Sequence, residues 1–185
     1  KCMTCVGKET VRTSDFHERL AGDKVILPGV GALGDAMEHL KRYELDKAIR
    51  ETVAKRKPFL GICLGLQLVL EGSEESSGVE GLGLLKGGIY RIPEKEGLKI
   101  PHIGWNSLDL KNNGRLFAGL EKNPYVYFVH SYYLRAAEPS VVKATTEYGV
   151  TIDASVEKDQ LFACQFHPEK SSATGLRILR NFAEL

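Results

Sequence analysis

The stretch Pro58-Phe59-Leu60-Gly61-Ile62-Cys63-Leu64-Gly65 places a cysteine where a short apolar strand is expected to turn into a helix. The G-x-C-x-G spacing matches the nucleophile elbow, with sulfur in place of the serine oxygen. Glycines flank the cysteine because the turn is tight and a Cβ on either side would clash. The helix expected to begin there, over the apolar run Leu66–Leu70, directs its positive end at the sulfur and favours the thiolate. The alternative is a buried structural cysteine in a glycine-bounded strand.

A second pattern favours catalysis. Residues Phe162 to Phe166 alternate as a buried strand and run directly into His167-Pro168-Glu169. Period two puts Gln165, His167 and Glu169 on one side of the extended chain. A histidine can move protons, and a carboxylate two residues later can orient its ring. A lone His-Pro-Glu is more often an ordinary loop, but a parallel sheet brings distant strand ends together. Paired with the elbow, it predicts catalytic Cys63, His167 and Glu169.

The bulk composition is that of a single-domain enzyme. The 185 residues suggest one domain over 1–185. Its 25 Lys and Arg nearly balance its 24 Asp and Glu, so charge gives no case for nucleic acid or membrane binding. The longest apolar stretch, Pro58 to Leu70, is shorter than the roughly 20 residues of a membrane helix, and the opening is unlike a signal peptide.

The cysteines indicate a reducing compartment and no metal site. Cys63 must stay reduced to act, so we expect a cytoplasmic protein. Cys2 and Cys5 form a lone C-x-x-C, and no second cysteine or histidine pair follows at zinc-ligand spacing. We therefore expect neither metal nor cofactor.

The first part of the chain reads as β/α. Val25–Leu27 is expected to form a strand that ends in the turn Pro28–Gly31. Asp35 with Glu38 predicts a capping box that opens a helix. An apolar stripe at spacing four then continues the helical pattern, at Leu45, Ile49 and Val53.

The second part is richer in strands and ends in a helix. That helix is expected to turn Leu176, Leu179 and Phe182 inward and Arg177 and Arg180 outward. The expected strands are Ile89 to Ile92, Lys99 to Trp105, Tyr125 to Val129, Val141 to Thr146, Val150 to Val156 and Gln160 to Phe166. The pattern predicts an α/β fold, a three-layer α/β/α domain with a mostly parallel central sheet and extra antiparallel strands.

The chain resembles the class I, or triad-type, glutamine amidotransferases from about Ser14 onward. The elbow and the His-Pro-Glu segment are shared across that class. Two further segments, Pro101–Asn106 and Tyr127–Tyr132, are similar to those of the branch that serves histidine biosynthesis. Alternatives are a glutaminase for tryptophan, purine or pyridoxal phosphate synthesis, or a non-catalytic regulatory module on the same fold.

The resemblance implies a chemistry for the predicted triad. Cys63 attacks the side-chain amide carbon of glutamine, His167 moves the protons and Glu169 orients His167. Two backbone N–H groups are implied to hold the oxyanion, one at Leu64 and one in the turn at Val30 and Gly31. The alternative for that turn is a simple βα connection.

The resemblance also implies a glutamine pocket. Gln67 lies one helical turn after the nucleophile, on the same face, and with the backbone near Ser131 and Tyr132 it corresponds to the substrate-binding positions. The alternative for Gln67 is a polar helix residue facing water. His130 and His102 have no nearby carboxylate in sequence, so we interpret them as structural or pocket residues.

The ammonia product implies a separate partner protein that receives it. Ammonia protonates in water and stops being a nucleophile, and the resemblance implies a separate (β/α)8-barrel cyclase subunit that receives it. Four residues match family positions near that interface: Trp105, Asn106, Tyr127 and Lys170. Large aromatic residues are common interface anchors, although core packing is the alternative for Trp105.

The start of the chain departs from the family. Members usually open with an apolar strand, a turn and a helix, whereas Lys1 to Thr10 is short, polar and cysteine-bearing. We therefore expect that the natural N-terminal strand and helix are missing before about residue 11.

Overall fold

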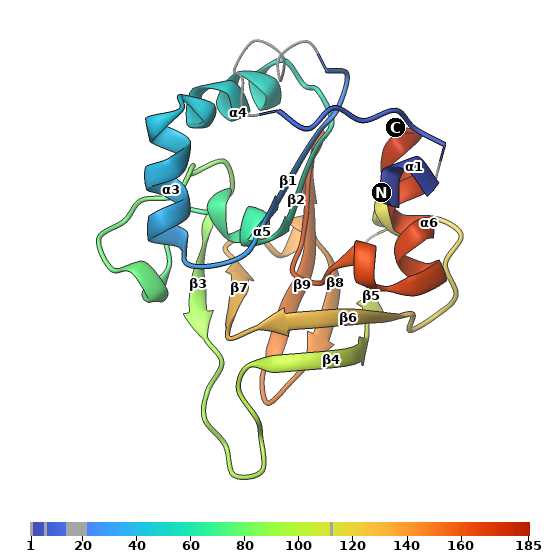
Figure 1. Ribbon diagram of the computed structural model, residues 1–185. Coiled ribbons are helices and arrows are strands. Elements are labelled where there is room, and N and C mark those ends of the chain that lie inside the picture. The colour runs from blue at the N-terminus through green and yellow to red at the C-terminus, as the bar shows by residue number, and fades with distance from the viewer. Residues whose placement is uncertain (1, 6, 14–21, 112) are drawn as a thin grey trace.

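A computed structural model describes residues 2–5, 7–13, 22–111 and 113–185 (Figure 1). Residues 14–21, where the resemblance begins, lie outside them. The helices are α1 (Cys2–Cys5), α3 (Leu33–Arg42), α4 (Leu45–Ala54), α5 (Leu64–Leu68) and α6 (Ser172–Ala183). The strands are β1 (Val25–Gly29), β2 (Phe59–Cys63), β3 (Gly87–Arg91), β4 (His102–Ser107), β5 (Asp109–Leu110), β6 (Tyr125–His130), β7 (Tyr132–Ala136), β8 (Val142–Glu147), β9 (Thr151–Lys158) and β10 (Leu161–Cys164).

The central sheet has the strand order β1-β2-β10-β9-β8-β5. Strand β2 pairs in parallel with β1 on one side and β10 on the other. Beyond β10 the strands β9, β8 and β5 are added antiparallel. The carboxyl ends of β1, β2 and β10 therefore meet at one edge of the sheet, where ligands bind in open α/β sheets.

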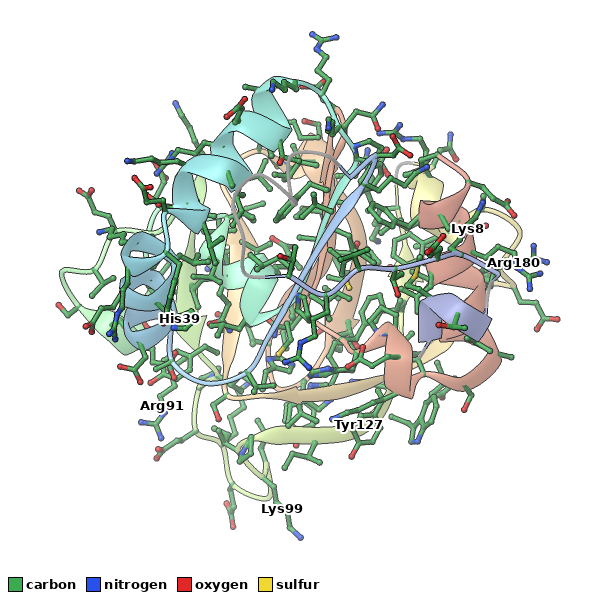
Figure 2. All side chains as sticks on the ribbon, turned by 45° about the horizontal axis from the view of Figure 1, so that its top comes forward. Lys8, His39, Arg91, Lys99, Tyr127 and Arg180 are labelled. Atoms are coloured by element: carbon green, nitrogen blue, oxygen red, sulfur yellow. The ribbon has the colours of Figure 1, made fainter. Side chains whose placement is uncertain are left out.

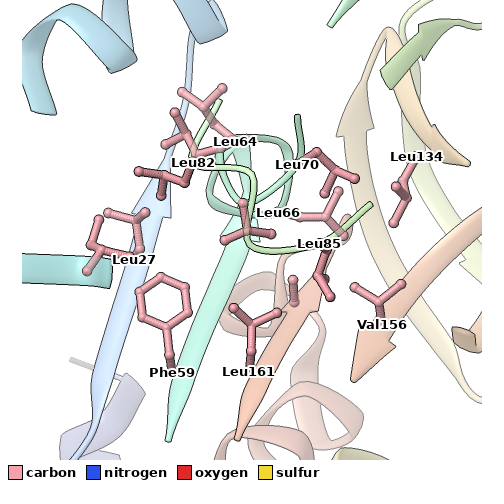
Figure 3. Packing of buried hydrophobic residues seen from close by; sticks show 14 of the residues in the cluster. Leu27, Phe59, Leu64, Leu66, Leu70, Leu82, Leu85, Leu134, Val156 and Leu161 are labelled. Atoms are coloured by element: carbon pink, nitrogen blue, oxygen red, sulfur yellow. The ribbon is translucent and has the colours of Figure 1, made fainter. Parts of the chain in front are cut away.

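Helices cover both faces of this sheet, as Figure 1 shows with α3 and α4 on one side and α6 on the other. On the first side, Leu27, Phe59, Leu66 and Leu161 pack into one apolar cluster (Figure 3). On the other side, a second cluster joins the sheet to α6 through residues such as Phe162 and Phe182. The expected α/β/α layering is confirmed. Within the described residues no helix has both the length and the apolar character needed to cross a bilayer.

Two antiparallel pairs, β3 with β7 and β4 with β6, stand apart from the central sheet. The β4–β6 pair lies across the end of the molecule toward which β1 and β2 run (Figure 1). Hydrogen bonds tie β6 to that edge, because the His167 N–H donates to the Tyr127 carbonyl at 2.9 Å. The pair therefore covers the edge where the parallel strands end.

The elbow depends on two close backbone approaches. A Cβ on Gly65 would lie 2.0 Å from the Leu27 carbonyl oxygen, and one on Gly61 would lie 2.6 Å from the Gly65 carbonyl oxygen. Real Cβ atoms do not approach a backbone oxygen so closely. Glycine at both positions thus lets β2 turn directly into α5 beneath β1, as the sequence predicts.

Two helix predictions are wrong in detail. Helix α3 begins at Leu33 with Ala32 at its N-cap, so Asp35 lies in the first turn and forms no capping box. The Gly34 N–H instead donates to the Ser76 hydroxyl at 3.0 Å, a cap supplied from a distant segment. In α6, Leu176 is 38% exposed and Ile178 is buried. A Cβ added at Gly175 would lie 1.8 Å from the Pro168 carbonyl oxygen, so the first turn of α6 packs closely against the residues that precede it.

The strand predictions differ from the structure at several places. Strands β5 and β7 were not expected, the strand predicted from Lys99 begins only at His102, and the last strand ends at Cys164 rather than Phe166. Glu169 lies in a 3-10 turn, Pro168–Lys170, and not on an extended chain. Proline at the start of that turn fixes its φ angle and favours the bend.

The close approach of α5 to β1 gives a stability prediction. Gly65→Ala should lower the free energy of unfolding by about 1–3 kcal/mol or more, because the new Cβ meets a backbone oxygen that cannot move away. Gly72→Ala is the matched control, since a Cβ there lies 3.5 Å from its nearest neighbour. Urea unfolding of both variants measures the difference, and equal midpoints would contradict this packing.

Candidate active site

Three segments meet where the parallel strands end. Gly29, at the end of β1, is the register partner of Cys63 at the end of β2. On the other side Cys164, at the end of β10, lies opposite Ile62. The turn after β1, the cysteine after β2 and the histidine after β10 are thus brought together from distant parts of the chain. The predicted meeting of Cys63 and His167 is found in the structure.

Cys63 occupies the strained corner of the elbow. Its φ of 55° and ψ of −106° are unfavourable for a residue with a Cβ, and such strain is typical of functional sites. The side chain is 8% exposed. Its Sγ lies 3.8 Å from the Val129 carbonyl oxygen and 3.8 Å from the Gln165 side-chain nitrogen. The sulfur is therefore held between β6 and the end of β10.

His167 is held from several directions. Its Nδ1 lies 2.7 Å from Glu169 Oε1. Its backbone N–H donates to the Tyr127 carbonyl at 2.9 Å, and its carbonyl accepts the Ser171 hydroxyl at 2.6 Å. Since Nδ1 faces the carboxylate, Nε2 is the ring nitrogen left for Cys63. The order sulfur, imidazole, carboxylate is that of a catalytic triad.

The same contacts influence the charges of His167 and Glu169. The hydrogen bond with the Cys63 side chain, followed by that with Glu169, raises the pKa of His167 to about 9. Burial is the largest single effect on Glu169 and raises its pKa, but the hydrogen bond from His167, a backbone hydrogen bond and the nearby charges of His167 and Lys170 together outweigh it, so the carboxyl pKa is lowered overall. His167 is thus mainly an imidazolium at neutral pH, beside an ionised carboxylate.

The second buried cysteine is a contrast to the first. Cys164 is fully buried, and its Sγ contacts the Phe166 carbonyl at 3.5 Å. Burial raises its thiol pKa well above the ordinary value. This cysteine is a structural core residue.

A cavity of about 220 Å³ opens beside the triad, lined by Pro28, Gly29, Val30, Ile62, His167 and Glu169. The Val30 side chain is 82% exposed, and Gly31 has a φ of +103° with open space around its Cβ position. The turn after β1 therefore forms one wall of the cavity and has room to move. Its backbone lies close to the elbow, because Gly29 pairs with Cys63.

None of the predicted pocket residues, Gln67, Ser131 and Tyr132, is among the residues that line this cavity. Gln67 is 6% exposed, so its alternative reading as a polar residue facing water is wrong. The Ser131 carbonyl accepts the Ile92 N–H at 2.9 Å, and the Tyr132 carbonyl lies 2.8 Å from His130 Nδ1. Ser131 joins β6 to Tyr132 at the start of β7, two residues after Val129, whose carbonyl contacts the Cys63 sulfur.

Two of the four predicted interface residues, Trp105 and Tyr127, lie on a largely exposed apolar face of β4 and β6, which we define as Ile103, Trp105, Tyr125 and Tyr127 and call the aromatic face. Trp105 is 51% exposed, so the core-packing alternative for it is wrong. Its ring meets that of Tyr127 edge-on, with centroids 5.9 Å apart. Figure 2 shows Tyr127 at the lower side of the molecule, beside β4. Asn106 is half-buried beside Trp105, and Lys170 is exposed.

Three contributors to the site were not predicted: the Val129 carbonyl, the Tyr127 carbonyl and Ser171, which also accepts the Tyr127 N–H at 2.9 Å. The carbonyls carry no sequence signal, because any residue supplies one. The sequence predicted Gln165 on the same side of the chain as His167, and both side chains do contact Cys63. The contact between Gln165 and Cys63 was not itself predicted.

Comparison with known proteins agrees with this geometry. The family model "Glutamine amidotransferase class-I" matches residues 7–185. The chain belongs to this family of enzymes. It is also 47% identical over 185 residues to the imidazole glycerol phosphate synthase subunit HisH of Caldanaerobacter subterraneus, covering 100% of this chain and 90% of the relative.

Other relatives carry the same name. HisH of Moorella thermoacetica is 48% identical over 100% of this chain and 87% of its own. HisH of Methanocaldococcus jannaschii is 47% identical over 96% of this chain and 88% of its own. Within the class I family, the chain therefore belongs with the HisH subunits.

Solved structures share the fold. A crystal structure of a glutamine amidotransferase superimposes with a TM-score of 0.77 at 18% identity, over 99% of this chain and 89% of that one. The glutaminase domain of the Trypanosoma brucei CTPS gives 0.69 at 15% identity, over 99% and 84%. The expected fold class is confirmed.

The raised pKa of His167 predicts a pH dependence of stability. The folded state binds this proton more tightly than the unfolded state, so the stabilisation is full below pH 6.5 and is lost as pH rises through about 9. The expected loss is about 1–3 kcal/mol. Urea unfolding of the wild type and His167→Gln across this range measures it, and their difference should shrink with rising pH.

An NMR titration gives the matched check. The pKa of His167 should fall in Glu169→Gln, because one of its two hydrogen-bond partners loses its charge. A wild-type pKa at or below 6.5 would contradict the described contacts.

Proposed function

We propose that this chain is the glutaminase subunit of imidazole glycerol phosphate synthase and that Cys63, His167 and Glu169 carry out the hydrolysis. The supporting observation is the hydrogen-bonded order of Cys63, His167 and Glu169 at the edge where β2 and β10 end. Glutamine is the substrate, and glutamate and ammonia are the products. No step requires a cofactor.

In the first half-reaction the Cys63 sulfur attacks the side-chain amide carbon of glutamine. The tetrahedral intermediate then collapses, and the His167 imidazolium gives its proton to the departing nitrogen. Ammonia leaves, a γ-glutamyl thioester remains on Cys63, and His167 is left neutral. Glu169 holds the ring in place throughout and stabilises its charged form.

In the second half-reaction the neutral His167 takes a proton from water, and the resulting hydroxide attacks the thioester carbon. Collapse of the second tetrahedral intermediate releases glutamate and returns the thiolate beside the imidazolium. The raised pKa of His167 suits both steps, because the charged ring is needed at the start and is restored at the end.

Two backbone N–H groups are proposed to hold the oxyanion. The Leu64 N–H follows the nucleophile directly, and the turn at Val30 and Gly31 supplies the second donor from the neighbouring strand. The positive φ and open surroundings of Gly31 allow this turn to reorient its peptide. Gln67 and the backbone at Ser131 and Tyr132 are proposed to hold the rest of the glutamine.

The product requires a docked partner, because free ammonia is protonated in water. We propose a heterodimer with a separate (β/α)8-barrel cyclase subunit, into which ammonia is channelled for the lyase reaction of the synthase in histidine biosynthesis. The aromatic face supports this, because exposed aromatic side chains are common binding anchors. Asn106 and Lys170 complete the proposed interface. A reactive thiol at Cys63 suits the reducing cytoplasm.

Glutamate release tests this function directly. The isolated chain should hydrolyse glutamine slowly, and a purified cyclase subunit with its nucleotide ligand should raise the rate greatly. Cys63→Ala should lower the rate by about 10³-fold or more, as expected for loss of a nucleophile. Cys164→Ala is the matched control and should keep the rate, since that thiol lies in the core. Equal activity of the two variants would contradict the assignment, and full turnover without the cyclase would contradict its proposed role.

A second pair of variants tests the oxyanion donor. Val30→Pro removes the backbone N–H, whereas Val30→Ala removes only an exposed side chain. If Val30 supplies the donor, the proline variant should lower kcat by about 10²–10³-fold and the alanine variant should leave it nearly unchanged. Iodoacetamide alkylation of Cys63 should proceed equally in both. Wild-type kcat in Val30→Pro would exclude this N–H.

A further inference from the structure

Two buried histidines connect Asn106, which follows Trp105 on β4, to the backbone of the proposed glutamine pocket. His102 on β4 and His130 on β6 are cross-strand partners, 3% and 6% exposed. His102 Nδ1 lies 3.0 Å from His130 Nε2. At the outer end, the Asn106 side-chain nitrogen lies 3.5 Å from His102 Nε2. At the inner end, His130 Nδ1 lies 2.8 Å from the Tyr132 carbonyl oxygen. These contacts form one continuous chain.

The donor-to-acceptor direction of this hydrogen-bond chain follows from the groups at its two ends. A carbonyl oxygen only accepts, so His130 must carry its proton on Nδ1, and its neutral Nε2 must accept. His102 therefore donates from Nδ1 and accepts at Nε2. The Asn106 amide is oriented independently, because its nitrogen donates to the Glu147 carbonyl at 3.0 Å and its oxygen accepts the Ser107 N–H at 2.9 Å. Asn106 thus presents a donor to His102, and every link agrees.

The rings are fixed in place and uncharged. His102 is stacked between Tyr148, with centroids 3.8 Å apart, and Phe128, at 4.7 Å. Burial lowers the pKa of His102 to about 4 and that of His130 to about 3. Both are therefore neutral at pH 7, which is the state in which one ring can donate to the other. The Cys63–His167–Glu169 contacts do not use this pair.

We propose that His130 and His102 are positioning residues. They hold the Tyr132 carbonyl, and with it the Ser131–Tyr132 backbone, in the conformation that binds glutamine, and they connect this backbone to Asn106 beside the aromatic face. This inference rests on the proposed function, since it assigns a role to the same pocket. It also gives a partner docked at Trp105 and Asn106 a hydrogen-bonded connection to the backbone that is proposed to hold the substrate.

Two substitutions at His130 distinguish the effect of its hydrogen bond to Tyr132 from the effect of its hydrogen bond to His102. His130→Leu removes both side-chain hydrogen bonds of His130. Loss of the one that holds the Tyr132 carbonyl should raise KM for glutamine by about two- to tenfold, as expected for one net hydrogen bond. His130→Asn places an amide nitrogen near the position of Nδ1 and retains the donor to Tyr132. It should restore most of the KM, while it loses the link to His102 and with it part of the stimulation by the cyclase.

The controls distinguish positioning from a structural role. Alkylation of Cys63 by iodoacetamide needs the reactive sulfur but no glutamine pocket, so its rate should match the wild type in both variants. His39→Asn makes the same change on α3, on the side of the molecule away from Tyr127 (Figure 2), and should leave KM and stimulation unchanged. A wild-type KM in His130→Leu would overturn the proposal. So would an alkylation rate that falls by the same factor as the KM rises. Glutamine turnover by the wild type remains a separate test of the proposed function.

The tautomers give a spectroscopic test on the wild type. Long-range proton–nitrogen NMR spectra at pH 7 should show both rings neutral with the proton on Nδ1, the less common tautomer of free histidine. A proton on Nε2 of His130, or a charged ring at either position, would break the chain and overturn the proposal.

Discussion

The structure depends on the convergence of three parallel strand ends beneath one crossing strand. Strands β1, β2 and β10 each deliver one part of the site to the same edge. Strand β6 then crosses that edge, and its carbonyls contact both reacting groups, at Val129 for the Cys63 sulfur and at Tyr127 for the His167 N–H. Because β6 also carries half of the aromatic face, the surface proposed for the partner and the catalytic groups share one element.

The parts predicted from sequence were those that local chemistry determines. Glycine is required at positions 61 and 65 because a Cβ at either would lie less than 3 Å from a backbone oxygen. The elbow could therefore be predicted from five residues. His167 was found because strand alternation led directly into it. The start of α3 was predicted wrongly because its cap comes from Ser76, a residue far along the chain.

Other features required the folded chain. The Val129 and Tyr127 carbonyls are invisible in sequence, since their identity as acceptors depends on the position of β6. The sequence led to the interpretation of His102 and His130 as structural or pocket residues, because no carboxylate lies nearby in sequence. In the fold the partner of each ring is another neutral group, reached across the β4–β6 register. Pairings between strands, rather than composition, therefore set the chemistry of these residues.

The central claim is that sulfur at Cys63 bonds covalently to the substrate. The most direct measurement is rapid acid quenching of the enzyme during glutamine turnover in the presence of the cyclase, followed by digestion and mass spectrometry. The account predicts a γ-glutamyl group on the peptide that contains Cys63. A γ-glutamyl group on the Cys164 peptide, or turnover with no modified peptide at any quench time, would contradict it.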